Sequence, residues 1–125
     1  MIDTWHTLIS SQKVVGISEL LSENVMLHSP VAYRPIQGKH KVMMYLTASF
    51  YTFINDSFKY VREVRNGNTA FLEFEVVIDG TFVNGIDVIE WNEEGKITDF
   101  KVMVRPLRGV QTIHDKMNMM LESTI

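Results

Sequence analysis

Two strand-like segments joined by a two-residue turn constrain the fold of this chain more than any other feature. Residues 70–78 alternate between two faces, as a β-strand does. The apolar side chains on one face are Leu72, Phe74, Val76 and Ile78. Asp79-Gly80 follows, a pair that favours a tight hairpin turn because both residues tolerate a left-handed backbone. Residues 81–91 then continue as a second long strand, so the sequence predicts an antiparallel hairpin at its centre.

The rest of the chain divides into helices before this hairpin and a strand and helix after it. Helical spacing of apolar residues predicts helices over residues 3–15, 19–22 and 39–54. A short strand is expected at residues 25–28, ended by Ser29-Pro30, and a loop at 31–38. Further strands are predicted at residues 58–64 and 96–105, and a C-terminal helix at 110–121. Helices followed by a four-stranded meander indicate the α+β class, and we expect one domain over residues 1–125.

The second strand of the hairpin is apolar on both faces. Val83, Ile89 and Trp91 share one face with Asp87, and Phe82, Ile86 and Val88 occupy the other. A sheet with one face in water would alternate more cleanly, so both faces are expected to be covered. The helices before the hairpin cover one face. The C-terminal helix could cover part of the other, but a second copy of the chain is its expected main cover, which predicts a homodimer.

Composition excludes several classes of protein. The chain has 125 residues and no cysteine, which excludes disulfides, thiolate metal sites and a thiol nucleophile. Its net charge of −3 argues against nucleic acid as the main partner. No apolar run is long enough to cross a membrane, and the N-terminus lacks the pattern of a signal peptide. We therefore expect a soluble, cytoplasmic protein.

The order of elements, together with several short motifs, resembles the NTF2-like superfamily and within it the SnoaL-like and ketosteroid-isomerase-like branch. The matching residues are Glu23 through Val31, Gly38-Lys39, Gly85-Ile86-Asp87, Asn92 through Ile97, and Val104-Arg105-Pro106-Leu107. This resemblance implies a cone: a curved, mostly antiparallel sheet wrapped around N-terminal helices, with an additional C-terminal helix. It also implies an apolar pocket at the open end and a dimer. The superfamily includes isomerases, hydrolases, cyclases, carriers and interaction domains, so each site residue needs its own argument.

Asp87 is the first candidate catalytic residue, because it is a carboxyl group among apolar neighbours. Burial disfavours its charged form, so it could donate a hydrogen bond to a substrate oxygen or act as a base. The resemblance places Asp87 at the position where ketosteroid isomerases hold the protonated aspartic acid of their oxyanion hole. The alternative is a buried Asp87 that is satisfied by Arg105 or another donor and has no catalytic role.

Other positions depart from the catalytic pattern of the relatives. Ser29 stands where ketosteroid isomerases carry their proton-shuttling Asp, and Trp5 falls near their first-helix Tyr. An indole donates a hydrogen bond but lacks the acidity of a phenol. Gly85 stands where limonene-epoxide-hydrolase-like relatives carry an Arg. Steroid isomerisation by the family mechanism is therefore not expected, and neither is epoxide hydrolysis.

His28 is the second candidate catalytic residue, since an imidazole could be the general base that Ser29 is not. SnoaL-like cyclases combine a pocket His with an acidic group, so His28 and Asp87 are the predicted pair. The alternative is that His28 bonds a loop carbonyl at the strand end. Arg105 could neutralise Asp87, bind a substrate carboxylate, or pair with Glu73 or Glu75 at a dimer interface. Those two carboxylates are expected on the outer face of the sheet, not in a hydrolase site.

Substrate contacts are expected from one charged side chain and from apolar or aromatic side chains: Arg105, Trp91, Phe50, Phe53, Tyr33 and Met103. The sequence contains no metal-ligand spacing of histidines and no glycine-rich phosphate loop, so no metal and no cofactor are expected. The leading hypothesis is a cofactor-free isomerase, cyclase or hydrolase acting on a small apolar molecule. The alternatives are a carrier of an apolar ligand and a dimeric interaction domain.

Overall fold

A computed structural model describes residues 1–124 of the chain. Three α-helices, one 3₁₀ helix and six strands follow one another along these residues. Their bounds are α1 (Ile2–Ser10), the 3₁₀ helix η1 (Val14–Leu20), β1 (Leu21–His28), β2 (Ile36–Gln37), α2 (Lys39–Phe53), β3 (Lys59–Asn66), β4 (Thr69–Ile78), β5 (Thr81–Trp91), β6 (Ile97–Arg105) and α3 (Leu107–Thr124).

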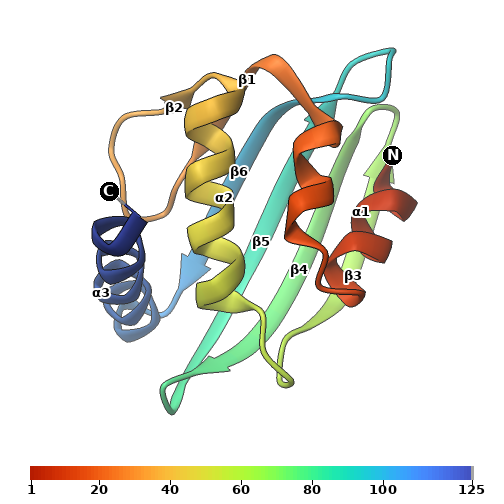
Figure 1. Cartoon of the computed structure of the whole chain (residues 1–125). Helices are drawn as coiled ribbons and strands as arrows, with labels where there is room; N and C mark the ends of the chain where they lie inside the picture. Colours follow the sequence, from red (N-terminus) through yellow and green to blue (C-terminus); the bar gives the residue numbers. More distant parts are fainter. Residues whose placement is uncertain (125) are drawn as a thin grey trace.

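The six strands form one curved sheet in the order β2-β1-β6-β5-β4-β3 (Figure 1). Neighbouring strands are antiparallel except β1 and β6, which run parallel. The predicted hairpin between β4 and β5 is confirmed, with Ile78 paired to Thr81. Asp79 and Gly80 have φ values of 50° and 78°, the left-handed geometry that a tight hairpin turn of this kind requires.

All the helices lie on one face of the sheet. Figure 1 shows α1 and α2 in front of the long strands and α3 beside α2, near the end of β6, and α3 packs against inward-facing side chains of β4 and β5. Side chains that point to this inner face form two buried clusters. One lies beneath α1, η1 and the middle of α2, and includes Trp5, Ile17 and Phe100. The other lies between α2, α3 and the strands β4 and β5, and includes Phe74 and Met117. The helices and the concave face of the sheet therefore enclose the core.

The outer face of the sheet carries large apolar side chains that no described segment covers. Five of them are exposed by two fifths or more of their surface: Val64, Phe71, Val77, Phe82 and Met103. Because α3 packs on the inner face, it does not cover this surface, and the expectation of partial cover by the C-terminal helix is wrong. The apolar character of both faces of β5 is nevertheless confirmed, since Ile86 and Val88 lie on this outer face, half-buried.

The beginning of the chain differs from its sequence-based prediction. α1 ends at Ser10 and not near residue 15, because Gln12 takes a left-handed backbone with φ of 57°. Its amide donates to Ile9 O at 3.2 Å and the Lys13 amide donates to Leu8 O at 3.0 Å, which caps the helix. The predicted helix at residues 19–22 is also wrong, since η1 ends at Leu20 and β1 begins at Leu21.

Candidate functional site

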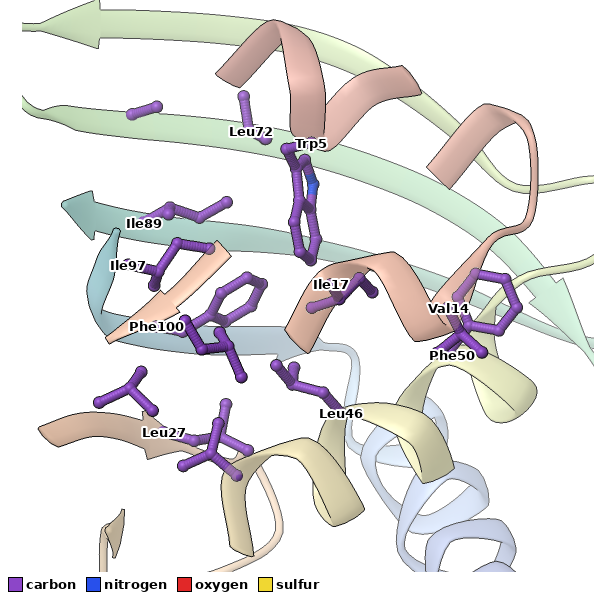
Figure 2. Packing of buried hydrophobic residues seen from close by; sticks show 14 of the residues in the cluster. Trp5, Val14, Ile17, Leu27, Leu46, Phe50, Leu72, Ile89, Ile97 and Phe100 are labelled. Carbon is purple, nitrogen blue, oxygen red and sulfur yellow. The ribbon is translucent and has the colours of Figure 1, made fainter. Parts of the chain in front are cut away.

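A narrow cavity lies between the inner face of the sheet, the α1–η1 segment and the C-terminal half of α2. Its volume is about 50 Å³ and its walls are almost entirely apolar. Fourteen side chains line it: Trp5, Ile9, Ile17, Leu46, Ser49, Phe50, Phe53, Ile54, Phe58, Tyr60, Phe74, Asp87, Phe100 and Val102. Figure 2 shows Trp5 reaching from α1 toward the sheet, where its ring lies 5.2 Å from that of Phe100. A cavity of this size suits a compact group of few heavy atoms.

Asp87 provides the one carboxyl group in the wall. Alternation along β5 sets its direction: it shares the inner face with Val83 and Ile89, which are fully buried. Its cross-strand partners are Leu72 on β4 and Val102 on β6, both apolar. The residue is only 7% exposed. Burial raises the pKa of Asp87 to about 7, so the neutral acid is well populated near neutral pH.

A chain of two hydrogen bonds connects Asp87 to α1. The Tyr60 hydroxyl donates to Asp87 Oδ2 at 2.7 Å. The Trp5 indole Nε1–H donates in turn to the Tyr60 oxygen at 3.1 Å. The bond from Tyr60 partly opposes the effect of burial on the pKa of Asp87, because it stabilises the carboxylate. Burial and the neighbouring Asp87 raise the pKa of Tyr60 well above its usual value, so the phenol stays protonated.

The second oxygen of Asp87 is open to the cavity. Oδ1 makes no hydrogen bond to any residue between 1 and 124, whereas Oδ2 is occupied by Tyr60. Every fully buried side-chain oxygen or nitrogen in these residues has a hydrogen-bond partner. Because Oδ1 has none, it is not fully buried. Asp87 therefore presents one free carboxyl oxygen to an apolar space, where it can donate when neutral and accept when ionised.

The structure does not bring His28 and Asp87 together, and the predicted pair is corrected here. On β1, Val25 and Leu27 point into the core, so His28 points to the outer face. There its Nε2 lies 2.8 Å from Asp99 Oδ1. The partner of His28 is therefore a carboxylate and not the loop carbonyl of the alternative. Side-chain period alone explains the difference, since residues one apart on a strand face opposite ways.

The predicted substrate contacts divide into two groups. Phe50 and Phe53 lie in the cavity wall, and their role in binding remains a prediction. The other four do not line the cavity: Arg105, Trp91, Tyr33 and Met103. Met103 and Arg105 lie on the outer face because Phe100 and Val102 of the same strand point inward.

Tyr33 is fully exposed on the loop after β1. Trp91 packs against the core at the end of β5, four residues or roughly 13 Å along the strand from Asp87. Neither side chain therefore reaches the cavity. Arg105 also makes no contact with Asp87, so it does not neutralise that carboxyl group.

Sequence reasoning missed Tyr60, the direct partner of Asp87. Seven of the eight residues of β3 are exposed and Tyr60 alone is partly buried, so the strand shows little periodicity. The sequence signal for an inward-facing Tyr60 was Phe58, an apolar residue two positions earlier and so on the same face of an extended chain. Phe58 lines the same cavity. Trp5 was noted as the counterpart of a catalytic Tyr, but its bond to another residue of this chain was not expected.

No cluster of three or more histidine, aspartate or glutamate side chains within residues 1–124 could hold a metal ion. None of the helices in this part of the chain combines the length and the apolar character needed to span a membrane.

Comparison with known proteins gives matches of sequence and of structure. The model of the SnoaL-like domain matches residues 2–100. No curated protein gives a significant match. A steroid delta-isomerase from Pseudomonas aeruginosa has 33% sequence identity and a TM-score of 0.93, over 98% of this chain and 90% of that one. A bacterial protein with a cystatin-like fold from Silicibacter pomeroyi has 31% identity and a TM-score of 0.81, over 89% of this chain and 77% of that one.

A more distant structure agrees on the fold alone. An NTF2-like protein from Mesorhizobium loti has 14% identity and a TM-score of 0.72, over 84% of this chain and 88% of that one. The predicted α+β cone with a curved, open sheet around helices is confirmed by these matches.

Proposed function

Because this chain belongs to the SnoaL-like domain family, within the NTF2-like fold, we propose that it binds a small, neutral, apolar molecule through a carbonyl oxygen. Asp87 is the residue that contacts this oxygen. The observation that carries the proposal is the free Oδ1 of a buried carboxyl group in an apolar cavity. The neutral acid donates a hydrogen bond to the carbonyl oxygen and stabilises the negative charge that develops there on enolisation.

The lining of the cavity argues for an uncharged ligand. None of the lining side chains is Lys, Arg or His, so an anionic group would lose its hydration without gaining a cationic partner. The ionised form of Asp87 would also repel an anion. The small volume favours a molecule of few heavy atoms, such as a cyclic ketone, over a multi-ring skeleton.

Isomerase-type chemistry without a cofactor is the activity to test first. The similarity to the Pseudomonas steroid delta-isomerase, at a third of residues identical, supports it. A group with a pKa of about 7 is also well matched to proton transfer near neutral pH. In this proposal, Asp87 donates a hydrogen bond to the carbonyl oxygen of a β,γ-unsaturated ketone. Water removes a proton from the α-carbon and returns one to the γ-carbon, so that the double bond moves into conjugation with the carbonyl group.

Binding without turnover is the second candidate, and one observation favours it. The lining side chains that titrate are Asp87 and Tyr60, and Tyr60 is already committed to Asp87. Ser29, at the position of the proton-shuttling Asp of ketosteroid isomerases, does not line this cavity. No second group is therefore placed to accept a proton from a substrate carbon.

The experiment compares ketones with hydrocarbons of the same shape. Tryptophan fluorescence reports binding, because Trp5 lines the cavity. We expect cyclohexanone to bind more tightly than methylenecyclohexane to the natural chain. Asp87→Ala should abolish this preference, and Asp56→Asn, on an exposed loop, should keep it. Equal affinity for both molecules in the natural chain would contradict the proposal.

Turnover is tested with a β,γ-unsaturated cyclic ketone, whose conjugated product absorbs in the ultraviolet. Formation of the product by the natural chain but not by Asp87→Ala would support the enzyme. Ketone binding without product formation would identify a carrier.

For the outer face of the sheet, we propose a homodimer. The exposed apolar side chains need a cover, and the charges beside them are complementary under two-fold symmetry. Glu75 on β4 and Arg105 on β6 both pair with Asn84 of β5, so they lie on either side of that strand. An axis parallel to β5 would place β4 of one copy over β6 of the other. Each Glu75 would then face an Arg105 of the second copy.

Sedimentation velocity tests the dimer. Phe71→Lys should give a monomer, because it adds a charge to the centre of the apolar face. Arg105→Glu should weaken association, and the double variant Arg105→Glu with Glu75→Arg should restore it. A natural chain that stays monomeric at high micromolar concentration would overturn this proposal.

A further inference from the structure

The hydrogen-bond chain beneath α1 has a direction that its first member sets. The indole of Trp5 is a donor only, since its nitrogen has no lone pair free to accept. At 3.1 Å, its Nε1–H must therefore donate to the Tyr60 oxygen. Trp5 is 3% exposed, so water does not compete for this bond.

The bond from Trp5 determines how Tyr60 and neutral Asp87 share their protons. Two arrangements are possible when Asp87 is protonated. In the first, Tyr60 donates to Oδ2 and the acid proton sits on Oδ1, toward the cavity. In the second, Asp87 donates from Oδ2 to the Tyr60 oxygen and the phenol proton turns away. The second arrangement requires the phenol oxygen, a weak acceptor, to accept twice, because Trp5 already occupies it.

We propose that Trp5 is a positioning residue, which fixes the direction of the chain Trp5–Tyr60–Asp87 and so turns the acid proton of Asp87 into the cavity. This inference rests on the proposed function of Asp87 and adds a residue to it. Trp5 acts through Tyr60, since no bond joins the indole nitrogen to Asp87 itself. The site then offers a donor to a ligand, which suits a carbonyl oxygen better than a hydroxyl group that must also donate.

Few other titratable groups face the hydrogen-bond chain Trp5–Tyr60–Asp87. The His6 ring packs edge-on against Tyr60, with ring centres 5.2 Å apart, and its Nε2 lies 2.5 Å from Glu63 Oε1. β4 and β6 present apolar Leu72 and Val102 to Asp87, and α2 presents the Ser49 hydroxyl to the cavity. Any signal from the hydrogen-bond chain must therefore be separated from one that arises at the neighbouring His6–Glu63 pair.

The first test follows the indole N–H of Trp5 by NMR between pH 5 and pH 9. Trp91→Phe is the background, because it leaves Trp5 as the single indole of the chain. We expect the signal to titrate with a midpoint of about 7, the value for Asp87. The titration should persist in His6→Ala and be absent in Asp87→Asn. It should also be lost in Tyr60→Phe, which keeps the ring and removes the hydroxyl that transmits the change.

The second test measures the titration midpoint of the Asp87 carboxyl group by NMR in four proteins. These are the natural chain, Trp5→Phe, Tyr60→Phe and the double variant. Loss of the indole donor weakens the bond from Tyr60, so Trp5→Phe should raise the midpoint. Tyr60→Phe should raise it further, and the double variant should match Tyr60→Phe, because Trp5 then has no path to Asp87.

A folded Trp5→Phe with an unchanged midpoint would overturn the inference. An indole signal that still follows Asp87 in Tyr60→Phe would overturn it too. If Trp5→Phe does not fold, the indole titration alone decides. Neither test uses a ligand, so a chain that behaves as expected but binds no ketone would refute the proposed function and leave this inference standing.

Discussion

The raised pKa of Asp87 predicts that this one residue makes the protein less stable as pH increases. The carboxyl group has a pKa of about 7 in the folded chain, against an ordinary value of 3.8 for an aspartate in water. Below pH 4 both states hold the proton. Between pH 4 and pH 7 the folded state keeps a proton that the unfolded state has lost, so the free energy of unfolding falls with rising pH. Well above pH 7 both states have lost the proton, so this contribution to the free energy of unfolding no longer changes with pH.

Asp87→Asn removes this dependence while keeping the shape of the side chain and an acceptor for Tyr60. A difference of about three pKa units corresponds to roughly 4 kcal/mol, at 1.36 kcal/mol per unit. We therefore expect the variant to gain roughly this amount relative to the natural chain between pH 4 and pH 8.

Urea unfolding followed by fluorescence at several pH values measures the effect. The free energies of unfolding of the two proteins should diverge steadily between pH 4 and pH 7 and run parallel above. Asp56→Asn, on an exposed loop, is the matched control and should show no such divergence. Curves for Asp87→Asn and the natural chain that stay parallel over the whole range would refute a buried, protonated Asp87.

Three further predictions concern the packing of the sheet and the placement of the site. Gly85→Ala should cost about 1–3 kcal/mol in the free energy of unfolding, because its Cβ would lie 2.4 Å from Phe74 Cζ and 2.6 Å from Met103 O. Gly16→Ala, whose Cβ meets only the flexible end of a leucine, should cost less in the same urea experiment. His28→Ala should leave the dissociation constant for cyclohexanone unchanged, and a large loss of affinity would show that our placement of the site is wrong. Val102→Phe should fill the cavity and abolish the fluorescence response to cyclohexanone, with thermal unfolding confirming that the chain is folded.

The parts of the fold that local sequence determines could be predicted, and so could the inward, buried position of Asp87. Alternation along β5 places Asp87 among inward-facing aliphatic side chains, and Asp79-Gly80 fixes the turn that aligns β4 with β5. The same two-residue period indicates that His28 faces away from Leu27, but the resemblance to cyclases led us to place it in the pocket. In that case the local pattern was the better guide.

The partners of Asp87 could not be predicted, because they depend on tertiary structure. Tyr60 is 27 residues from Asp87 in sequence, and Trp5 is a further 55 residues before Tyr60. β3 is mostly exposed, so its pattern does not show which side chain turns inward. Only the curvature of the sheet beneath α1 brings the three groups together.

The central claim is that Asp87 is a neutral acid near pH 7 because it lies in an apolar cavity. The most direct test is the chemical shift of its carboxyl carbon, followed by NMR from pH 3 to pH 9 in the natural chain and assigned with Asp87→Asn. We predict a midpoint of about 7, moving upward when cyclohexanone is bound, since the ketone stabilises the protonated form. A midpoint near the ordinary aspartate value of 3.8 would mean that the carboxyl group is ionised at neutral pH and would contradict the account.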